Sequence, residues 1–218
     1  MTSRQCRMLW PLYLYTLLIV VIHLIGCTVT LPLKPTLPPP TEGTKIPVTI
    51  GVYYSAEFRT YQHVSARGGD RWIFPLGTAS VALFDQVFPR VFASTKAVQS
   101  RPPLPPSDGA LTAIIEPRIE TFDYQLAGFI GGTVTVEITY RFTLHSPRGD
   151  PIASWVVKGM AGTFARIDKV TNLAMRDAAT KFPTSFEEVP EVRRWLRQVN
   201  TPGVGWLPWR LHALFKRG

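Results

Sequence analysis

Residues 133–144 read TVTVEITYRFTL, and their alternation decides the fold class of this 218-residue chain. Apolar side chains take every even-numbered position, and polar or charged side chains take every odd-numbered one. Successive side chains of a β-strand point to opposite faces, so this alternation predicts a strand with one buried and one solvated face. The fold is therefore expected to be built around a sheet.

Two flanking stretches extend this strand into an antiparallel meander. Residues 111–124 are mostly apolar and β-rich, and a flexible turn at 128–132 leads from them into the central strand. The partner strand at 152–164 follows the turn SPRGDP at 146–151, whose proline, glycine and aspartate suit a tight connection. This turn also contains the adhesion tripeptide RGD at 148–150, but the needs of the turn are a sufficient reason for these residues.

The N-terminal half of the body begins with a further strand. Residues 46–54, IPVTIGVYY, are apolar and β-branched, which suits a buried strand. Alternation at 58–64 and again at 71–74 predicts a hairpin across the turn at 67–70.

A helix is expected to start at Thr78, which is a suitable N-cap. Its apolar face has helical spacing and is interpreted as core; the residues are Val81, Phe84, Val87, Phe88, Val91 and Phe92. Pro89 lacks a backbone N–H and clashes with the carbonyl of Asp85, so it predicts a kink or a helix end near Phe88.

Two more helices complete the body. Asp168 is expected to cap a helix that ends at Pro183, and a shorter helix begins near Pro190. The apolar face of the shorter helix holds Val192, Trp195, Leu196 and Val199. The order of strand, helix, three antiparallel strands and helices predicts an α+β fold, a mostly antiparallel β-sheet with helices packed on one face.

The first 26 residues have the organisation of a secretion signal. Arg4 and Arg7 precede the apolar run LYLYTLLIVVIHL at 12–24. That run is short for a membrane span, which needs about 20 apolar residues, and fits a signal region of about 7 to 15. An uncleaved anchor helix and a signal without lipidation remain as alternatives.

Residues 24–27, LIGC, follow the apolar run and resemble the lipobox of bacterial lipoproteins. In that family the cysteine thiol is alkylated by diacylglycerol, and the signal is cut just before the cysteine. The resemblance implies that Cys27 is the lipidated N-terminus of the mature protein and its membrane anchor. With enterobacterial-type sorting, an aspartate after the cysteine retains a lipoprotein in the inner membrane, so Thr28 points to the outer membrane.

The charge balance is basic. The chain holds 24 basic and 15 acidic residues, a formal charge of +9, and removal of Arg4 and Arg7 with the signal leaves 22 − 15 = +7. This balance favours anionic partners such as acidic lipid head groups or lipopolysaccharide, whereas nucleic acid is not expected for an exported protein. Cys6 leaves with the signal, so the mature chain keeps Cys27 alone and forms no internal disulfide.

Residues 28–45 have the composition of a tether. They hold five prolines and no aromatic residue, which favours polyproline II over a packed core. At about 3.1 Å per residue, such a tether would reach roughly 55 Å from the bilayer. A loop that lies across the domain is the alternative.

Patterns typical of catalysis or metal binding are scarce. His63, His145 and His212 are isolated in the sequence, and no zinc-protease, paired-cysteine, nucleophile-elbow or phosphate-loop motif is present. The adjacent Glu187 and Glu188 fit a solvated face or a favourable contact with a helix dipole. The sequence therefore predicts no enzyme, no cofactor and no metal, although a triad assembled from distant positions stays open.

The C-terminal tail at 200–218 mixes large apolar and basic residues. Trp206, Trp209 and Arg210 form a combination suited to a membrane interface. Three interpretations remain: a tail packed back on the domain, contact with the membrane interface, or docking on another protein.

The order of elements and the lipobox together resemble the small periplasm-facing lipoproteins of Gram-negative envelopes. That loose group includes LptE-like lipopolysaccharide-assembly lipoproteins and ABC-transporter auxiliary lipoproteins. The resemblance covers about residues 46–186 and includes the phrases GVYYSAEFR and IIEPRIETFDY.

We therefore expect a signal peptide at 1–26, a lipidated cysteine with its tether at 27–45, an α+β periplasmic domain at 46–199 and a tail at 200–218. The leading hypothesis is a non-enzymatic outer-membrane lipoprotein that faces the periplasm. Its domain would bind an envelope protein or lipid in assembly or transport. The alternatives are a structural subunit of an envelope complex with no ligand of its own and an unrecognised hydrolase.

Overall fold

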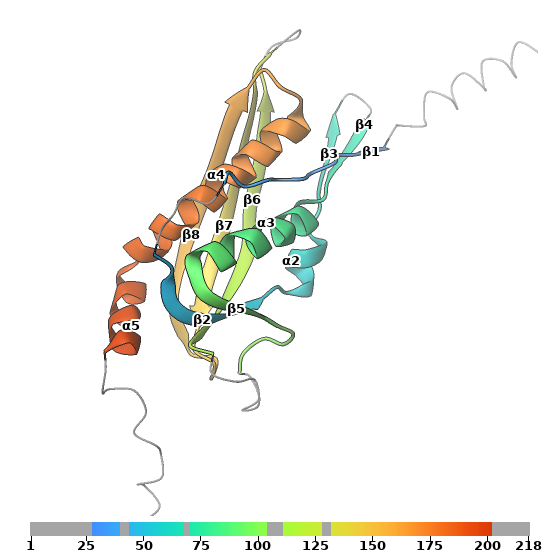
Figure 1. The fold of residues 1–218 in the computed structure, drawn as a ribbon. Coiled ribbons are helices and arrows are strands. Elements are labelled where there is room, and N and C mark those ends of the chain that lie inside the picture. The colour runs from blue at the N-terminus through green and yellow to red at the C-terminus, as the bar shows by residue number, and fades with distance from the viewer. Residues whose placement is uncertain (1–27, 40–43, 68–69, 104–110, 128–131, 202–218) are drawn as a thin grey trace, which may run out of the picture.

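In the computed structural model, two sheets and a layer of helices make up the body (Figure 1). The structure describes residues 28–39, 44–67, 70–103, 111–127 and 132–201. The larger sheet contains, in spatial order, β5 (Phe92–Val98), β2 (Ile46–Tyr53), β6 (Ala113–Leu126), β7 (Val134–His145) and β8 (Pro151–Thr163). The smaller sheet contains β1 (Thr28–Thr30), β4 (Asp70–Phe74) and β3 (His63–Arg67). The helices are α2 (Ala56–Thr60), α3 (Leu76–Val91), α4 (Ile167–Glu188) and α5 (Pro190–Asn200).

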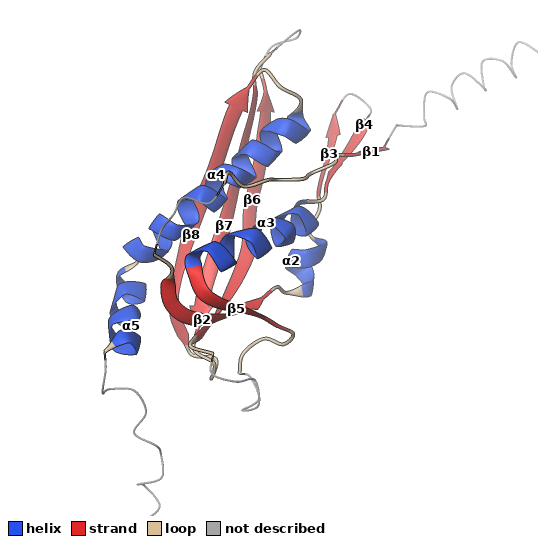
Figure 2. Cartoon of the chain, in the orientation of Figure 1, coloured by secondary structure: helices blue, strands red, loops and turns tan. Residues whose placement is uncertain are grey.

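The antiparallel meander predicted from the sequence is present as β6, β7 and β8. All even-numbered side chains of β7 are buried, whereas Glu137 and Arg141 lie on the other face. Figure 2 shows α3 and α4 on one side of the larger sheet. The predicted α+β class, with helices packed on one face of a sheet, is confirmed.

β5 directly follows α3 and is not predicted by the sequence pattern. Its first residue, Phe92, is buried and continues the helical spacing, so the sequence pattern places it on the helix instead. The strand lies at the edge of the sheet, and four of its five central residues are exposed with no alternation between the two faces, which leaves little periodic signal. β2 lies between β5 and β6 and is parallel to both, so the sheet is mixed, with its longest ladders antiparallel.

The predicted boundaries of α3 are wrong at both ends. The helix begins at Leu76, and Thr78 lies exposed in its first turn. It continues through Pro89 to Val91 instead of stopping near Phe88. A proline removes one backbone hydrogen bond, and this loss is tolerated because the helix ends two residues later and keeps Val91 buried.

The boundaries predicted for α4 also need correction. Arg166 precedes the helix, and Asp168 lies in its first turn, where it accepts a hydrogen bond from Arg166 Nε at 3.1 Å. Pro183 does not end the helix, which runs on to Glu188. Burial of Phe186 beyond the proline offsets the proline penalty of about 3 kcal/mol. The shorter helix predicted near Pro190 is present as α5, with Pro190 at its first position.

The predicted hairpin across residues 67–70 is present as β3 and β4. Its first arm begins at His63, however, and residues 56–60 form α2 in place of the predicted strand. The Ser55 hydroxyl accepts a hydrogen bond from the Phe58 N–H at 3.1 Å, which caps α2, and Phe58 is buried.

Residues 28–39 lie against the body, which is the alternative to an extended tether. The Leu31 N–H donates to the Ile73 carbonyl at 2.9 Å, and the Lys34 N–H donates to Asn172 Oδ1 at 3.0 Å. Arg90 Nη1 donates to the Pro38 carbonyl at 2.6 Å. Leu31 is buried, and the segment crosses the helical layer (Figure 1). The composition favours an extended backbone, and these hydrogen bonds hold that backbone on the domain.

Aromatic side chains fill the core between the sheet and the helices. Phe182 of α4 lies within 6.3 Å, between ring centroids, of each of its aromatic neighbours, which are Phe88, Phe92, Phe142, Trp155 and Phe186. Among the helices that the structure describes, none combines the length and apolar character needed to cross a membrane.

Candidate functional site

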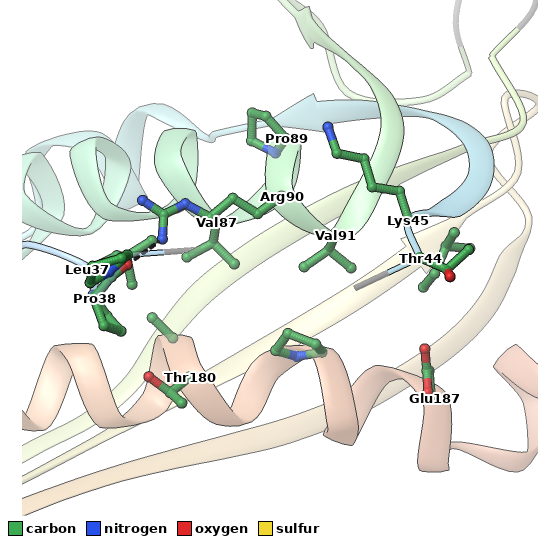
Figure 3. A pocket seen from close by; sticks show the side chains of 14 residues that line it. Leu37, Pro38, Thr44, Lys45, Val87, Pro89, Arg90, Val91, Thr180 and Glu187 are labelled. Atoms are coloured by element: carbon green, nitrogen blue, oxygen red, sulfur yellow. Dashed lines mark hydrogen bonds between the residues drawn. The ribbon is translucent and has the colours of Figure 1, made fainter. Parts of the chain in front are cut away.

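A groove of about 590 Å³ lies between residues 37–39 and 44–46, the end of α3 and α4 (Figure 3). Its walls are largely apolar, and Val87, Val91 and Pro183 are among its lining residues. Lys45 and Glu187 supply charge, whereas the Arg90 guanidinium donates to the Pro38 carbonyl. The described lining residues offer mostly apolar side chains, which suit contact with an apolar group.

A buried charge cluster lies on the sheet face away from the helices. Glu116 of β6 is only 1% exposed, and its carboxylate contacts three basic side chains. Arg101 Nε lies 3.2 Å from one carboxylate oxygen, and Arg118 Nη2 lies 3.0 Å from the other. His145 Nε2 lies 3.5 Å from the same oxygen as Arg101. Burial of a carboxylate costs free energy unless charged partners compensate for the lost water. Because Arg101 is one of these partners, its contact with Glu116 keeps Arg101 and its neighbouring residues against the sheet.

The pairing of His145 with Glu116 brings a histidine and an acid together, as hydrolases often require. Neither ring nitrogen of His145 has a hydrogen-bond partner within the described parts of the chain. A nucleophile activated by this histidine would have to lie within hydrogen-bond reach of it. Among the described residues, His145 belongs to the ion cluster that Glu116 forms with Arg101 and Arg118.

Replacing Glu116 with glutamine is expected to cost about 1–3 kcal/mol of unfolding free energy, because a buried charged acceptor with two guanidinium partners is lost. Chemical denaturation measures this change. Glu120→Gln is the matched control, since Glu120 lies on the same strand, is partly exposed and pairs with Arg141. The control is expected to cost less than about 1 kcal/mol. Equal losses in the two variants would show that Glu116 does not hold the loop.

His63 belongs to an aromatic cluster that joins the two sheets. Its ring centroid lies 4.9 Å from that of Phe122 and 5.7 Å from that of Phe74. Burial lowers the pKa of His63 from its ordinary value of 6.5, and the nearby Asp123 carboxylate partly opposes this shift. His63 thus packs as a member of this aromatic cluster.

The RGD turn is held by local hydrogen bonds. The Ser146 hydroxyl accepts from the Asp150 N–H and donates to Asp150 Oδ2, both at 3.1 Å. Gly149 has a φ of +99°, a conformation that favours glycine. The turn therefore accounts for Gly149 and Asp150 without an adhesion role.

The structure separates the remaining predicted site residues. Glu187 lines the groove, whereas Glu188 is exposed at the end of α4. The predicted lipid-attachment residue and the tail residues lie outside the described residues; these are Cys27, Trp206, Trp209, Arg210 and His212. No group of three potential metal ligands occurs within the described ranges.

The sequence reasoning missed the contact between Glu116 and Arg101. A charged residue inside the apolar strand start IIEPR was the available signal, because such a residue needs a buried partner. The identity of that partner depends on how the connection after β5 folds over the sheet.

No protein-family model matches the chain, and no curated protein matches it. Among solved structures, the chain is similar to a Xanthomonas campestris protein of the family DUF330, at 9% identity and a TM-score of 0.44, over 72% of this chain and 92% of that one. It is also similar to a minor lipoprotein from Acinetobacter baumannii, at 10% identity and a TM-score of 0.40, over 69% and 96% of the two chains. A hypothetical protein from Chlamydia trachomatis matches at 10% identity and a TM-score of 0.36, over 71% and 98%. Likenesses at this level assign no function to the chain.

Proposed function

We propose that this protein is a lipoprotein of a Gram-negative envelope, attached to the outer membrane through acyl chains on Cys27 and facing the periplasm. The observation that carries the proposal is the LIGC sequence at the end of a charged and then apolar leader.

The body acts as a binding or accessory module in envelope assembly or transport and catalyses no reaction. Two features support this part of the proposal: the apolar lining of the groove and the ion pairs that occupy Glu116. The lipid keeps the module at the membrane surface and so raises its local concentration near partners in that membrane. The partner is an envelope protein or lipid, and co-purification from detergent extracts of whole envelopes would identify it.

Cys27→Ser is expected to move the protein out of the membrane fraction or to leave it unprocessed with its leader, because serine offers no thiol for alkylation. Fractionation and immunoblotting measure the distribution, and the body should keep its stability because residue 27 precedes β1. If the variant were cleaved normally and still pelleted with membranes, the proposed anchor would be wrong.

Thr28→Asp is expected to shift the protein from the outer to the inner membrane in a host with enterobacterial-type sorting. Density-gradient separation of the two membranes measures the shift. Thr30→Asp is the matched control, since Thr28 and Thr30 are both exposed on β1 and the same charge is introduced. Only the residue next to the lipidated cysteine should redirect the protein. Equal sorting of the two variants would remove the basis for the outer-membrane assignment.

A further inference from the structure

No linker residue separates the proposed anchor, Cys27, from β1 of the body. Thr28, Val29 and Thr30 pair in parallel with β4, where Thr28 is aligned with Arg71. Consecutive Cα atoms are about 3.8 Å apart, so residue 27 lies one residue from a strand. A lipid on residue 27 would therefore fix the smaller sheet beside the bilayer.

The smaller sheet is firmly joined to the rest of the body. Trp72 of β4 stacks on Tyr124 of β6 with 6.4 Å between ring centroids. The Tyr124 hydroxyl donates to Ser65 Oγ at 2.7 Å, and Phe74 is fully buried. Because these contacts span both sheets, the orientation of β1 sets the orientation of the whole body.

Exposed apolar side chains gather at the same end of the molecule. Seven large hydrophobic residues are exposed in the part of the chain that the structure describes, and four of them lie at this end. The four are Val29 of β1, Val64 of β3, Phe164 after β8 and Leu173 in the second turn of α4, with exposed fractions of 39%, 44%, 80% and 37%.

The register places Phe164 at this end. Thr163, the last residue of β8, is aligned with Val134, and Val134 is aligned with Leu126 at the end of β6. Leu126 is two residues beyond Tyr124, which contacts the smaller sheet. Figure 1 shows the end of β8, the start of α4 and the smaller sheet together, with α5 at the opposite end.

We infer that this end, formed by the smaller sheet, the β8 to α4 connection and the start of α4, is a membrane-contact surface that rests on the phospholipid bilayer. The inference rests on the proposed lipid anchor at Cys27. The exposed charges at this end are mixed, since Arg71 and Lys169 lie there alongside Asp70. The inference of membrane contact therefore rests on the anchor position and the apolar side chains, and not on charge. A surface phenylalanine such as Phe164 suits the boundary of head groups and acyl chains. The strands of the larger sheet then point toward the membrane.

Fluorescent labelling at single cysteines tests this orientation. Once Cys27 is alkylated and Cys6 has left with the signal, the mature chain has no free thiol, so an introduced cysteine is labelled alone. Ala66→Cys and Phe164→Cys place the label on the membrane-contact surface. Ser154→Cys is the control; Ser154 is exposed on β8, ten residues before Phe164 and about 33 Å away at about 3.3 Å per residue.

The lipidated protein is reconstituted into vesicles of phosphatidylethanolamine and phosphatidylglycerol that contain a lipid with a nitroxide on its head group. Labels at 66 and 164 are expected to be quenched at least about twofold more than the label at 154, because interfacial side chains lie within about 5–10 Å of the head groups. Equal quenching at the three positions would overturn the inference.

The mass of the same samples separates this inference from the proposed function. Equal quenching in protein that carries acyl groups on residue 27 would reject the membrane-contact surface and leave the anchor standing. Protein without acyl groups would reject the anchor and, with it, the inference that depends on it.

Discussion

Replacing Gly159 with alanine is expected to destabilise the body by about 3 kcal/mol, because α4 packs directly on the backbone of β8 at this position. A Cβ atom on residue 159 would lie 2.1 Å from the Ala174 carbonyl oxygen and 2.8 Å from both the Ala178 Cβ and its backbone nitrogen. Backbone atoms cannot rotate away as a side chain does, so the helix must shift from the sheet. Thermal or chemical denaturation measures the loss.

Gly162→Ala is the matched control for Gly159→Ala on the same strand. There the nearest atom to a new Cβ is Thr135 Oγ1 at 3.4 Å, an ordinary contact with a side chain. We expect the control to change stability by less than about 1 kcal/mol. If Gly159→Ala were equally mild, the packing of α4 on β8 would have to be looser than the structure shows.

Phe182→Ala is expected to cost about 3–5 kcal/mol, because the variant leaves a cavity at the centre of the aromatic core. Phe182 is fully buried, and its ring centroid lies 4.8 Å from that of Phe142 and 5.3 Å from that of Phe88. The ring thus links α4 to both the sheet and α3. Chemical denaturation measures the change in unfolding free energy.

The comparison for Phe182→Ala is another apolar residue of α4. Leu173 is 37% exposed, and Leu173→Ala is expected to cost less than about 1 kcal/mol. A similar loss for the two variants would mean that helix propensity, and not the aromatic core, determines the contribution of α4.

Elements with a strong period could be predicted from the sequence, whereas elements fixed by neighbours could not. The alternation at 133–144 predicts β7 because one face of that strand is covered by helices and the other is not. β1 has only three residues and an exposed pattern, and it pairs with a strand about 40 residues away. Its place in the smaller sheet depends on that pairing rather than on its own composition.

Proline was the main source of wrong boundaries. Pro89 and Pro183 both lie inside helices, each near the end of its helix. In both cases a buried residue follows the proline, Val91 in α3 and Phe186 in α4. The free energy gained by burying these side chains outweighs the cost of placing proline inside a helix. That gain depends on tertiary packing, so local sequence does not reveal it.

The candidate site was less predictable than the fold. The cluster around Glu116 joins residues from β6, β7 and the connection after β5, and no spacing in the sequence links Arg101 to His145. The composition of residues 28–39 suggested a free tether. Prolines favour an extended backbone, however, whether that backbone is free in solvent or bound to the surface of the domain. The hydrogen bonds of Leu31 and Lys34 show that it is held. Under the lipid-anchor proposal, the body therefore lies closer to the bilayer than a free tether would place it.

Mass spectrometry of the N-terminal peptide of protein purified from native membranes tests the central claim most directly. The lipid-anchor proposal predicts a chain that begins at residue 27 and carries the added mass of diacylglycerol on the cysteine sulfur. A chain that begins at Met1, or one with an unmodified thiol at Cys27, would contradict it.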